Sequence, residues 1–293
     1  MSAKNNLRME SEATKRSGEV YLCQVDERVS CGACCGLYNV RDLSQGSLEA
    51  MLTGRTEEFA RMPRTVEAIE AFQKKIEGWT PPKRPFPDFY HCPFLGLIGL
   101  NGRRVGCLLH PAAAGNNGID WRGLSYYGAM ACRIYFCPSV RQLPRSYLQI
   151  FRLAMDHWYP FGLIVTERRL LAAFFREVEG RIGRPITAAD FGKRSESVEL
   201  LREFAGLKRG WPFRRKDAPG PCNYFFENGE YPRPPVQRWG KNVPLSRYEE
   251  IFKELESAFS SKKDLRAAED LLDNLFSRLQ AAIPKHIKNK NSF

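Results

Sequence analysis

Apolar residues recur every three or four positions over much of the chain, which is the pattern of helices with one buried face. The clearest case is residues 264–283, where leucine and alanine follow a heptad-like spacing up to Pro284. A capping-box pair, Ser246 and Glu249, precedes a shorter apolar run. The same spacing predicts further helices, one of them capped by Thr166, over residues 42–62, 63–79, 146–158, 166–183 and 196–205.

Strand patterns are few. Residues 95–100 and 103–109 flank Asn101-Gly102, the strongest short-range hairpin signal because both central residues of the favoured turn need a positive φ. A two-residue turn at that place would set Cys107 opposite Gly96. Weaker patterns predict a short strand over residues 20–25 and a second hairpin over residues 222–229.

These elements predict an α+β fold that is mainly α. Residues 1–17 lack apolar periodicity and are predicted to be a disordered arm. Residues 18–145 are expected to form a small cysteine-rich metal-binding region, a loop plus a β-hairpin packed on helices, and residues 146–293 a mainly helical region. Within the first region, the proline-rich residues 80–93 would run as an extended, helix-free connection from the helix over residues 63–79 to the hairpin.

The charge of the chain is strongly positive. Its 293 residues carry 45 basic against 33 acidic side chains, for a formal net charge of +12. Such a balance favours an anionic partner, but no nucleic-acid-binding motif accompanies it. We therefore expect only weak, non-specific binding of nucleic acid at low salt, since released counterions drive such binding.

The first residues include no apolar stretch that could act as a signal peptide, and no run approaches the ~20 apolar residues of a membrane span. The sequence thus predicts a cytoplasmic protein without a membrane span. Thiols stay reduced in that compartment, so its cysteines are expected to be metal ligands or redox groups rather than a disulfide framework.

The chemistry of the chain centres on Ser30-Cys31-Gly32-Ala33-Cys34-Cys35-Gly36. Cys31 and Cys34 have the two-residue spacing that lets two thiolates bind one metal, and Cys35 adds a third sulfur. Four later cysteines are expected to converge on this loop. The predicted metal ligands are Cys31, Cys34, Cys35, Cys92, Cys107, Cys132 and Cys137.

Counting ligands limits the kind of centre. Thiolates suit an iron-sulfur cluster or zinc, each with four ligands, and a 4Fe-4S cluster is favoured over zinc. Two four-coordinate centres would need eight ligands, which the seven cysteines and His110 would supply. Cys92 and Cys107 can share a centre only if the chain bends between residues 93 and 96. Cys23 and Cys222 have no partner at ligand spacing and are expected to be dispensable for metal.

No other catalytic constellation is present in the sequence. It contains no phosphate-binding loop, no dinucleotide fingerprint, no Gly-x-Ser-x-Gly elbow and no His-Glu-x-x-His. His157 is interpreted as a structural or capping residue. The catalytic residues, if the protein is an enzyme, are therefore unknown from the sequence.

The cysteine blocks resemble the cysteine-cluster (CxxCxxCC) family of zinc- or iron-chelating proteins, which includes relatives of flagellin lysine N-methylase. The matching blocks are Ser30 to Cys35, Cys92-Pro-Phe-Leu95, Cys107-Leu-Leu-His-Pro111 and Cys132-Arg-Ile-Tyr-Phe-Cys137. Arg28 stands where the family has its first cysteine, and the stretch from Cys107 to Cys132 is longer than the family's.

This resemblance implies metal binding and, through the methylase relatives, a protein-modifying enzyme with a protein substrate. The favoured function is thus an iron-sulfur protein in a redox or protein-modifying role. The alternative is a non-enzymatic, zinc-stabilised interaction module that uses its basic surface.

Overall fold

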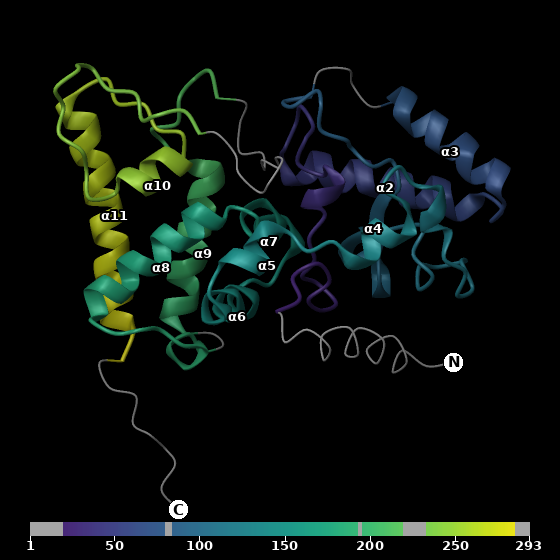
Figure 1. Ribbon diagram of the computed structural model, residues 1–293, viewed down its shortest axis with the longest axis horizontal. Helices are drawn as coiled ribbons and strands as arrows, with labels where there is room; N and C mark the ends of the chain where they lie inside the picture. The colour runs from purple at the N-terminus through teal and green to yellow at the C-terminus, as the bar shows by residue number, and fades with distance from the viewer. Residues whose placement is uncertain (1–19, 80–83, 193–194, 219–232, 285–293) are drawn as a thin grey trace, which may run out of the picture. The chain divides into compact units, whose positions relative to one another are not determined.

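A computed structural model describes residues 20–79, 84–192, 195–218 and 233–284. The described residues form ten α-helices and one two-stranded antiparallel sheet, so the fold is α+β and mainly α, as predicted (Figure 1). They divide into two compact units. Unit 1 comprises the described residues of 20–142 and 156–166, and unit 2 those of 143–155, 167–218 and 233–284.

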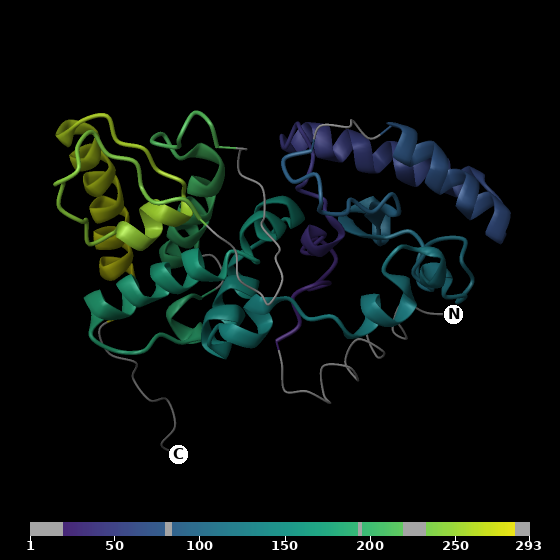
Figure 2. The same cartoon turned by 45° about the horizontal axis from the view of Figure 1, so that its top comes forward.

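Two helices of unit 1 follow the cysteine loop and lie side by side in Figures 1 and 2. Helix α2 is Gln45–Arg61, and it begins where the Ser44 hydroxyl accepts a hydrogen bond from the Ser47 N–H. Helix α3 is Val66–Trp79, with an apolar face centred on Phe72. Phe59 of α2 meets Phe72 edge to face, with ring centroids 5.2 Å apart. Both helices were predicted, within about four residues, from their apolar spacing.

The predicted hairpin is present with a longer turn. Strand β1, Leu95–Ile98, pairs antiparallel with β2, Arg104–Cys107, around the short 3₁₀ helix η2, Leu100–Gly102. Asn101 and Gly102 both have φ of 60°, as the turn signal required. Gly99 also takes a positive φ, so the loop spans five residues and the register moves by one. Cys107 therefore lies opposite Leu95, and the predicted pairing with Gly96 is wrong.

Short helices make up the rest of unit 1: η1 (Ala33–Cys35), η3 (Trp121–Leu124), α4 (Gly128–Ile134), α5 (Pro138–Gln142) and α7 (Trp158–Ile164). The strand expected over residues 20–25 is reduced to a single bridge between Gln24 and Ser30. Helix α5 begins at Pro138, which is favoured there because the first residue of a helix needs no N–H for the helical hydrogen bonds. His157 caps α7 by accepting the Tyr159 N–H, which confirms its capping role.

Unit 2 is a group of packed helices: α6 (Arg145–Ala154), α8 (Arg168–Ile182), η4 (Ala188–Asp190), α9 (Glu196–Gly210), α10 (Glu249–Glu254) and α11 (Lys262–Ala282). Their core is aromatic, with the Phe174 ring 4.4 Å from Phe204 and 5.6 Å from Phe276 between centroids. Glu167 occupies the N-cap of α8, so the predicted cap at Thr166 is wrong by one residue. Helix α9 runs five residues beyond its predicted end.

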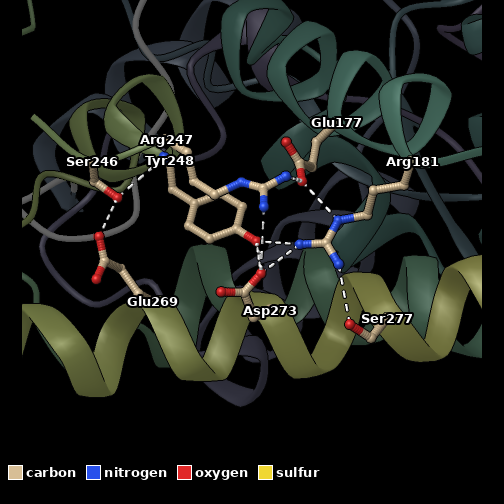
Figure 3. A network of polar contacts seen from close by, with 8 residues as sticks. All are labelled: Glu177, Arg181, Ser246, Arg247, Tyr248, Glu269, Asp273 and Ser277. Carbon is tan, nitrogen blue, oxygen red and sulfur yellow. Dashed lines mark hydrogen bonds and ion pairs between the residues drawn. The ribbon is translucent and has the colours of Figure 1, made fainter.

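A polar network links α8, α10 and α11 at the edge of this core (Figure 3). Arg181 of α8 donates to Asp273 of α11 and to the hydroxyl of Tyr248, each at 2.5 Å. The Tyr248 hydroxyl in turn donates to Asp273 at 2.6 Å. Glu177 holds Arg181 from the preceding turn of α8. These bonds fix the orientation of α10, which is too short to be stable by itself.

A second network of unit 2 is deeply buried. Arg233 lies between three carboxylates, 2.6 Å from Glu167 and 3.4 Å from both Glu254 and Glu256. Lys208 reaches Glu167 at 3.1 Å. Burial by itself would raise the pKa of Glu167, but Lys208 and Arg233 outweigh it and the pKa is lowered. Sequence patterns did not indicate this network, because its members lie far apart in the chain.

In the described residues, no helix combines the length and apolar character needed to cross a membrane. The predicted arm over residues 1–17 and the second hairpin over residues 222–229 lie outside the described residues. The longer helices occur in the predicted order, whereas the short helices α4, α5 and α7 were not predicted.

Candidate metal-thiolate centre

The cysteine loop is folded around the single 3₁₀ turn η1. The N–H groups of Cys35 and Gly36 donate to Gly32 and Ala33 carbonyls at 3.2 and 2.8 Å, which closes the turn. Gly36 has φ of 78°, and a Cβ on it would lie 2.2 Å from the Tyr90 carbonyl oxygen. This is the position where glycine is required, because the proline-rich connection passes directly against the turn.

Polar side chains hold that connection in place. The Asn39 amide donates to the carbonyls of Phe86 and Phe89 at 2.8 and 2.9 Å. Buried His91 bonds the Gly36 carbonyl through Nδ1 at 2.7 Å. The Cys92 N–H then donates to the Cys35 carbonyl at 2.8 Å. These bonds hold Cys92 beside the cysteine loop, although the two are far apart in the sequence.

The chain bends between residues 93 and 96, as the sequence analysis required for Cys92 and Cys107 to lie close together. Leu95 N–H approaches the Cys92 carbonyl at 3.5 Å across a turn at Pro93 and Phe94, directly before β1. Burial, followed by the charge of Cys107, raises the pKa of Cys92 to about 12. Burial likewise raises the pKa of Cys107 to about 12. A bound metal cation would instead lower the pKa of both thiols and favour their thiolate forms.

Cys23 lies next to Cys31, which the sequence reading missed. The bridge between Gln24 and Ser30 brings the two segments together, and the Cys31 N–H donates to the Cys23 carbonyl at 2.8 Å. Burial, and then the charges of Cys34 and Cys137, raise the pKa of Cys23. The sequence analysis missed this proximity because the eight-residue spacing to Cys31 resembles no metal motif.

The last two cysteines come from α4 and from the residue before α5. Burial and the charge of Cys34 raise the pKa of Cys132. They also raise the pKa of Cys137, although a hydrogen bond from the Val140 N–H acts in the opposite direction. Cys132 is exposed, whereas Cys137 is half-buried. The structure thus brings all seven predicted ligand cysteines, together with Cys23, into one neighbourhood of unit 1.

Backbone N–H groups point at several of these sulfurs. The Ala33 N–H donates to Cys31 Sγ at 3.4 Å. Hydrogen bonds of the same kind, from the residue two positions later, lower the pKa of three further thiols against the larger effect of burial: Phe94 to Cys92, Leu109 to Cys107 and Ser139 to Cys137. Such bonds stabilise thiolates, the form that binds metal.

Positive side chains lie beside the thiols. Arg55 of α2 is buried and donates to the Cys92 carbonyl at 3.2 Å and to His91 at 2.9 Å. Burial lowers its pKa to about 10, and the charge of Cys92 acts in the opposite direction. Arg122 lowers the pKa of both Cys107 and Cys132. These cations are suited to balance a negatively charged metal-thiolate group.

The histidines of unit 1 have other partners. His110 Nδ1 accepts the Ala112 N–H at 3.1 Å, which is a local structural role. His91 donates from Nδ1 to Gly36 and accepts from Arg55 at Nε2, and burial lowers its pKa to about 4. The rings of His91 and His110 therefore have hydrogen-bond roles of their own, as His157 does at the N-cap of α7, while the thiols supply the soft donors of the site.

The donor set of this site suits a metal group by its chemistry and not by its spacing in this structure. In the described part of the chain, no three histidine, cysteine, aspartate or glutamate side chains surround one point closely enough for a single ion. The chemistry of the donors fits thiolate-bound metal: eight cysteines with backbone N–H donors and nearby arginines. The buried hydroxyls of Ser30 and Tyr90 also find no hydrogen-bond partner among the described residues. Such donors fit a group that accepts hydrogen bonds.

Comparisons with family models, with curated proteins and with solved structures each return no match to this chain.

Proposed function

We propose that unit 1 binds iron-sulfur through its cysteine thiolates, with a 4Fe-4S cluster as the favoured form, and that the protein has a redox or protein-modifying role. One observation carries this proposal: cysteines from five separate segments, 23, 31–35, 92, 107 and 132–137, gather around turn η1. Such an arrangement concentrates the soft sulfur donors that suit iron-sulfur clusters and zinc.

The surroundings of the thiols favour a redox cofactor. An iron-sulfur cluster supplies one-electron transfer, and its potential depends on hydrogen bonds to sulfur, nearby charge and solvent exposure. The chain offers all three: N–H donors at Cys31, Cys92, Cys107 and Cys137, the buried charge of Arg55, and the exposed position of Cys132. The exposed side of the site would face an electron or substrate partner.

The resemblance of the four cysteine blocks supports placing the chain near the cysteine-cluster family. Under that proposal the protein acts in the cytoplasm on a protein substrate, in the manner suggested by the flagellin lysine N-methylase relatives. The same thiolate centre also suits a redox role, because an iron-sulfur cluster carries electrons.

Zinc is the alternative metal. Four thiolates also make a structural zinc site, and the net charge of +12 would suit an interaction module with an acidic partner or weak nucleic-acid binding at low salt. In that case the metal stabilises unit 1 and takes no part in electron transfer.

Anaerobic, chelator-free purification separates these functions. A brown protein with matched iron and acid-labile sulfide supports the iron-sulfur proposal, and a colourless protein with stoichiometric zinc supports the alternative. A protein without either metal would contradict both. Cys31→Ser, Cys34→Ser, Cys132→Ser and Cys137→Ser should each lose metal, whereas Cys222→Ser is the matched control and should keep it.

A further inference from the structure

A short antiparallel bridge at the start of unit 1 has a cysteine on each of its two arms. Gln24 and Ser30 form the bridge. The residues directly outside it are Cys23 and Cys31, and the Cys31 N–H donates to the Cys23 carbonyl at 2.8 Å. The two cysteines are therefore opposite each other in the ladder, with their side chains on the same face.

The turn between the two arms is fixed by its own hydrogen bonds. The Val25 N–H donates to the Val29 carbonyl at 2.9 Å, which closes the turn. The carboxylate of Asp26 accepts the N–H groups of Arg28 and Val29 at 2.7 and 2.8 Å. Val29 is also fully buried. These contacts keep the two arms in register without help from the thiols.

Strand β2 holds the same turn from outside. The side-chain amide of Gln24 donates to the Val105 carbonyl at 3.0 Å. Arg104 donates to the Asp26 carbonyl at 3.0 Å. Both arms of the bridge thus have a fixed place on the hairpin β1–β2, and the two cysteines at its end stay together in the reduced protein.

The spacing of opposite residues suits a disulfide between these cysteines. Cα atoms of a hydrogen-bonded antiparallel pair are about 5.5 Å apart, and disulfides join Cα atoms about 4.4–6.8 Å apart. Cβ atoms of opposite residues are about 4.5–5.5 Å apart, so one arm must move inward by about 1 Å. The bridge lies outside the two strands of the sheet, so this movement leaves the β1–β2 pairing intact. A bond formed in this way is reduced more easily than a relaxed disulfide.

We propose that Cys23 and Cys31 form a reversible disulfide when the metal-free chain meets a low-molecular-weight disulfide such as oxidised glutathione. The thiolate of one cysteine attacks the small disulfide and releases one thiol. The other cysteine then attacks the protein sulfur of the mixed disulfide and releases the second thiol. The two cysteines are oxidised, the small disulfide takes up their two electrons, and the two cysteine protons end on the released thiols. Both cysteines are free in this structure and only half-buried, which leaves them open to such a reagent.

This disulfide would act on the metal site through Cys31. Cys31 is one of the ligands of the proposed function, and only a thiolate sulfur binds metal in this way. Oxidation should therefore prevent metal loading, and bound metal should protect Cys31 from oxidation. This consequence rests on the proposed function, whereas the disulfide itself does not.

Peptide mapping tests the disulfide directly, because trypsin cuts after Arg28, between the two cysteines. The metal-free chain is treated with oxidised glutathione, its remaining thiols are alkylated, and the digest is analysed by mass spectrometry. Most of the peptide of residues 17–28 should be joined to the peptide of residues 29–41. Fragmentation should place the bond between Cys23 and Cys31, and dithiothreitol should separate the two peptides.

Single variants locate the bond. Cys23→Ser and Cys31→Ser should each lose the linked pair. Cys34→Ser is the matched control, since it changes a cysteine of the same tryptic peptide and should keep the pair. A glutathione adduct on the exposed Cys132 shows that the reagent has acted. An unlinked Cys23 beside a modified Cys132, or a Cys23 linked to Cys34, would overturn the inference.

The same mapping on the metal-loaded chain tests the effect on metal. The linked pair should stay at background before the metal is removed with a chelator and appear afterwards. Equal amounts of the pair with and without bound metal would overturn the coupling of the disulfide to the site. A wild-type chain that contains no metal but still forms the pair would contradict the proposed function and leave the disulfide standing.

Discussion

Replacing Gly36 by alanine should open the cysteine loop. The residue has φ of 78°, which costs an alanine about 1–2 kcal/mol relative to glycine. The new Cβ would also lie 2.2 Å from the Tyr90 carbonyl oxygen, and this neighbour is backbone that cannot rotate away. Either the turn or the connection must move.

That movement breaks two hydrogen bonds across the contact. They run from His91 Nδ1 to the Gly36 carbonyl at 2.7 Å and from the Cys92 N–H to the Cys35 carbonyl at 2.8 Å. Each contributes about 1 kcal/mol net. Together with the backbone term, the expected loss of local stability is about 3–4 kcal/mol, which corresponds to a change of about 10²–10³ in an opening equilibrium.

Amide hydrogen exchange is the suitable assay, because two compact units need not unfold in one transition. The Cys92 N–H should exchange about 10²–10³ times faster in Gly36→Ala than in the wild type, and metal should be lost with it. Gly54→Ala is the matched control, since Gly54 is exposed in α2 with open space around it. It should stabilise α2 by about 0.5–1 kcal/mol. Wild-type exchange at Cys92 in Gly36→Ala would refute the close approach of loop and connection.

Two further predictions concern the buried charges of unit 2. Arg233→Met should destabilise α8 and α10 by about 3–5 kcal/mol, because it leaves buried carboxylates without their cation, and faster amide exchange in those helices would show it. The exposed pair of Arg176 and Glu250 gives the control, Arg176→Met, which should change stability by less than about 1 kcal/mol. The lowered pKa of Glu167 adds stability that is present above its unfolded pKa of about 4.3 and lost as pH falls through the lower folded value. Protection of α8 should therefore fall steeply below about pH 4.3, and Glu167→Gln should flatten that dependence; an unchanged pH profile in the variant would contradict it.

Local patterns predicted the elements of this fold well and their ends less well. The helices α2, α3 and α11 follow from apolar spacing that tertiary contacts did not override. The hairpin register failed because Gly99 added a second positive-φ position to the turn, and the dipeptide Asn101-Gly102 alone does not indicate a five-residue loop. Helix α5 was not predicted, although proline, here Pro138, is favoured at the first position of a helix.

The sequence motif identified part of the candidate site. Cys31, Cys34 and Cys35 were identified by spacing, and a bend at Pro93 was correctly required for Cys92 to meet Cys107. The proximity of Cys23 to Cys31 depends on a single bridge between residues 24 and 30, which has no periodic signal. The buried network around Arg233 was missed for the same reason: contacts between residues far apart in the chain leave no local pattern.

The central claim is that the gathered cysteines of unit 1 hold metal. Native mass spectrometry of the anaerobically purified chain measures this most directly, because the mass beyond that of the polypeptide identifies what is bound. Our account predicts the added mass of a 4Fe-4S cluster, or of zinc under the alternative, in the wild type and the loss of that mass in Cys31→Ser. A spectrum of the bare 293-residue polypeptide, without iron, sulfide or zinc, would contradict it.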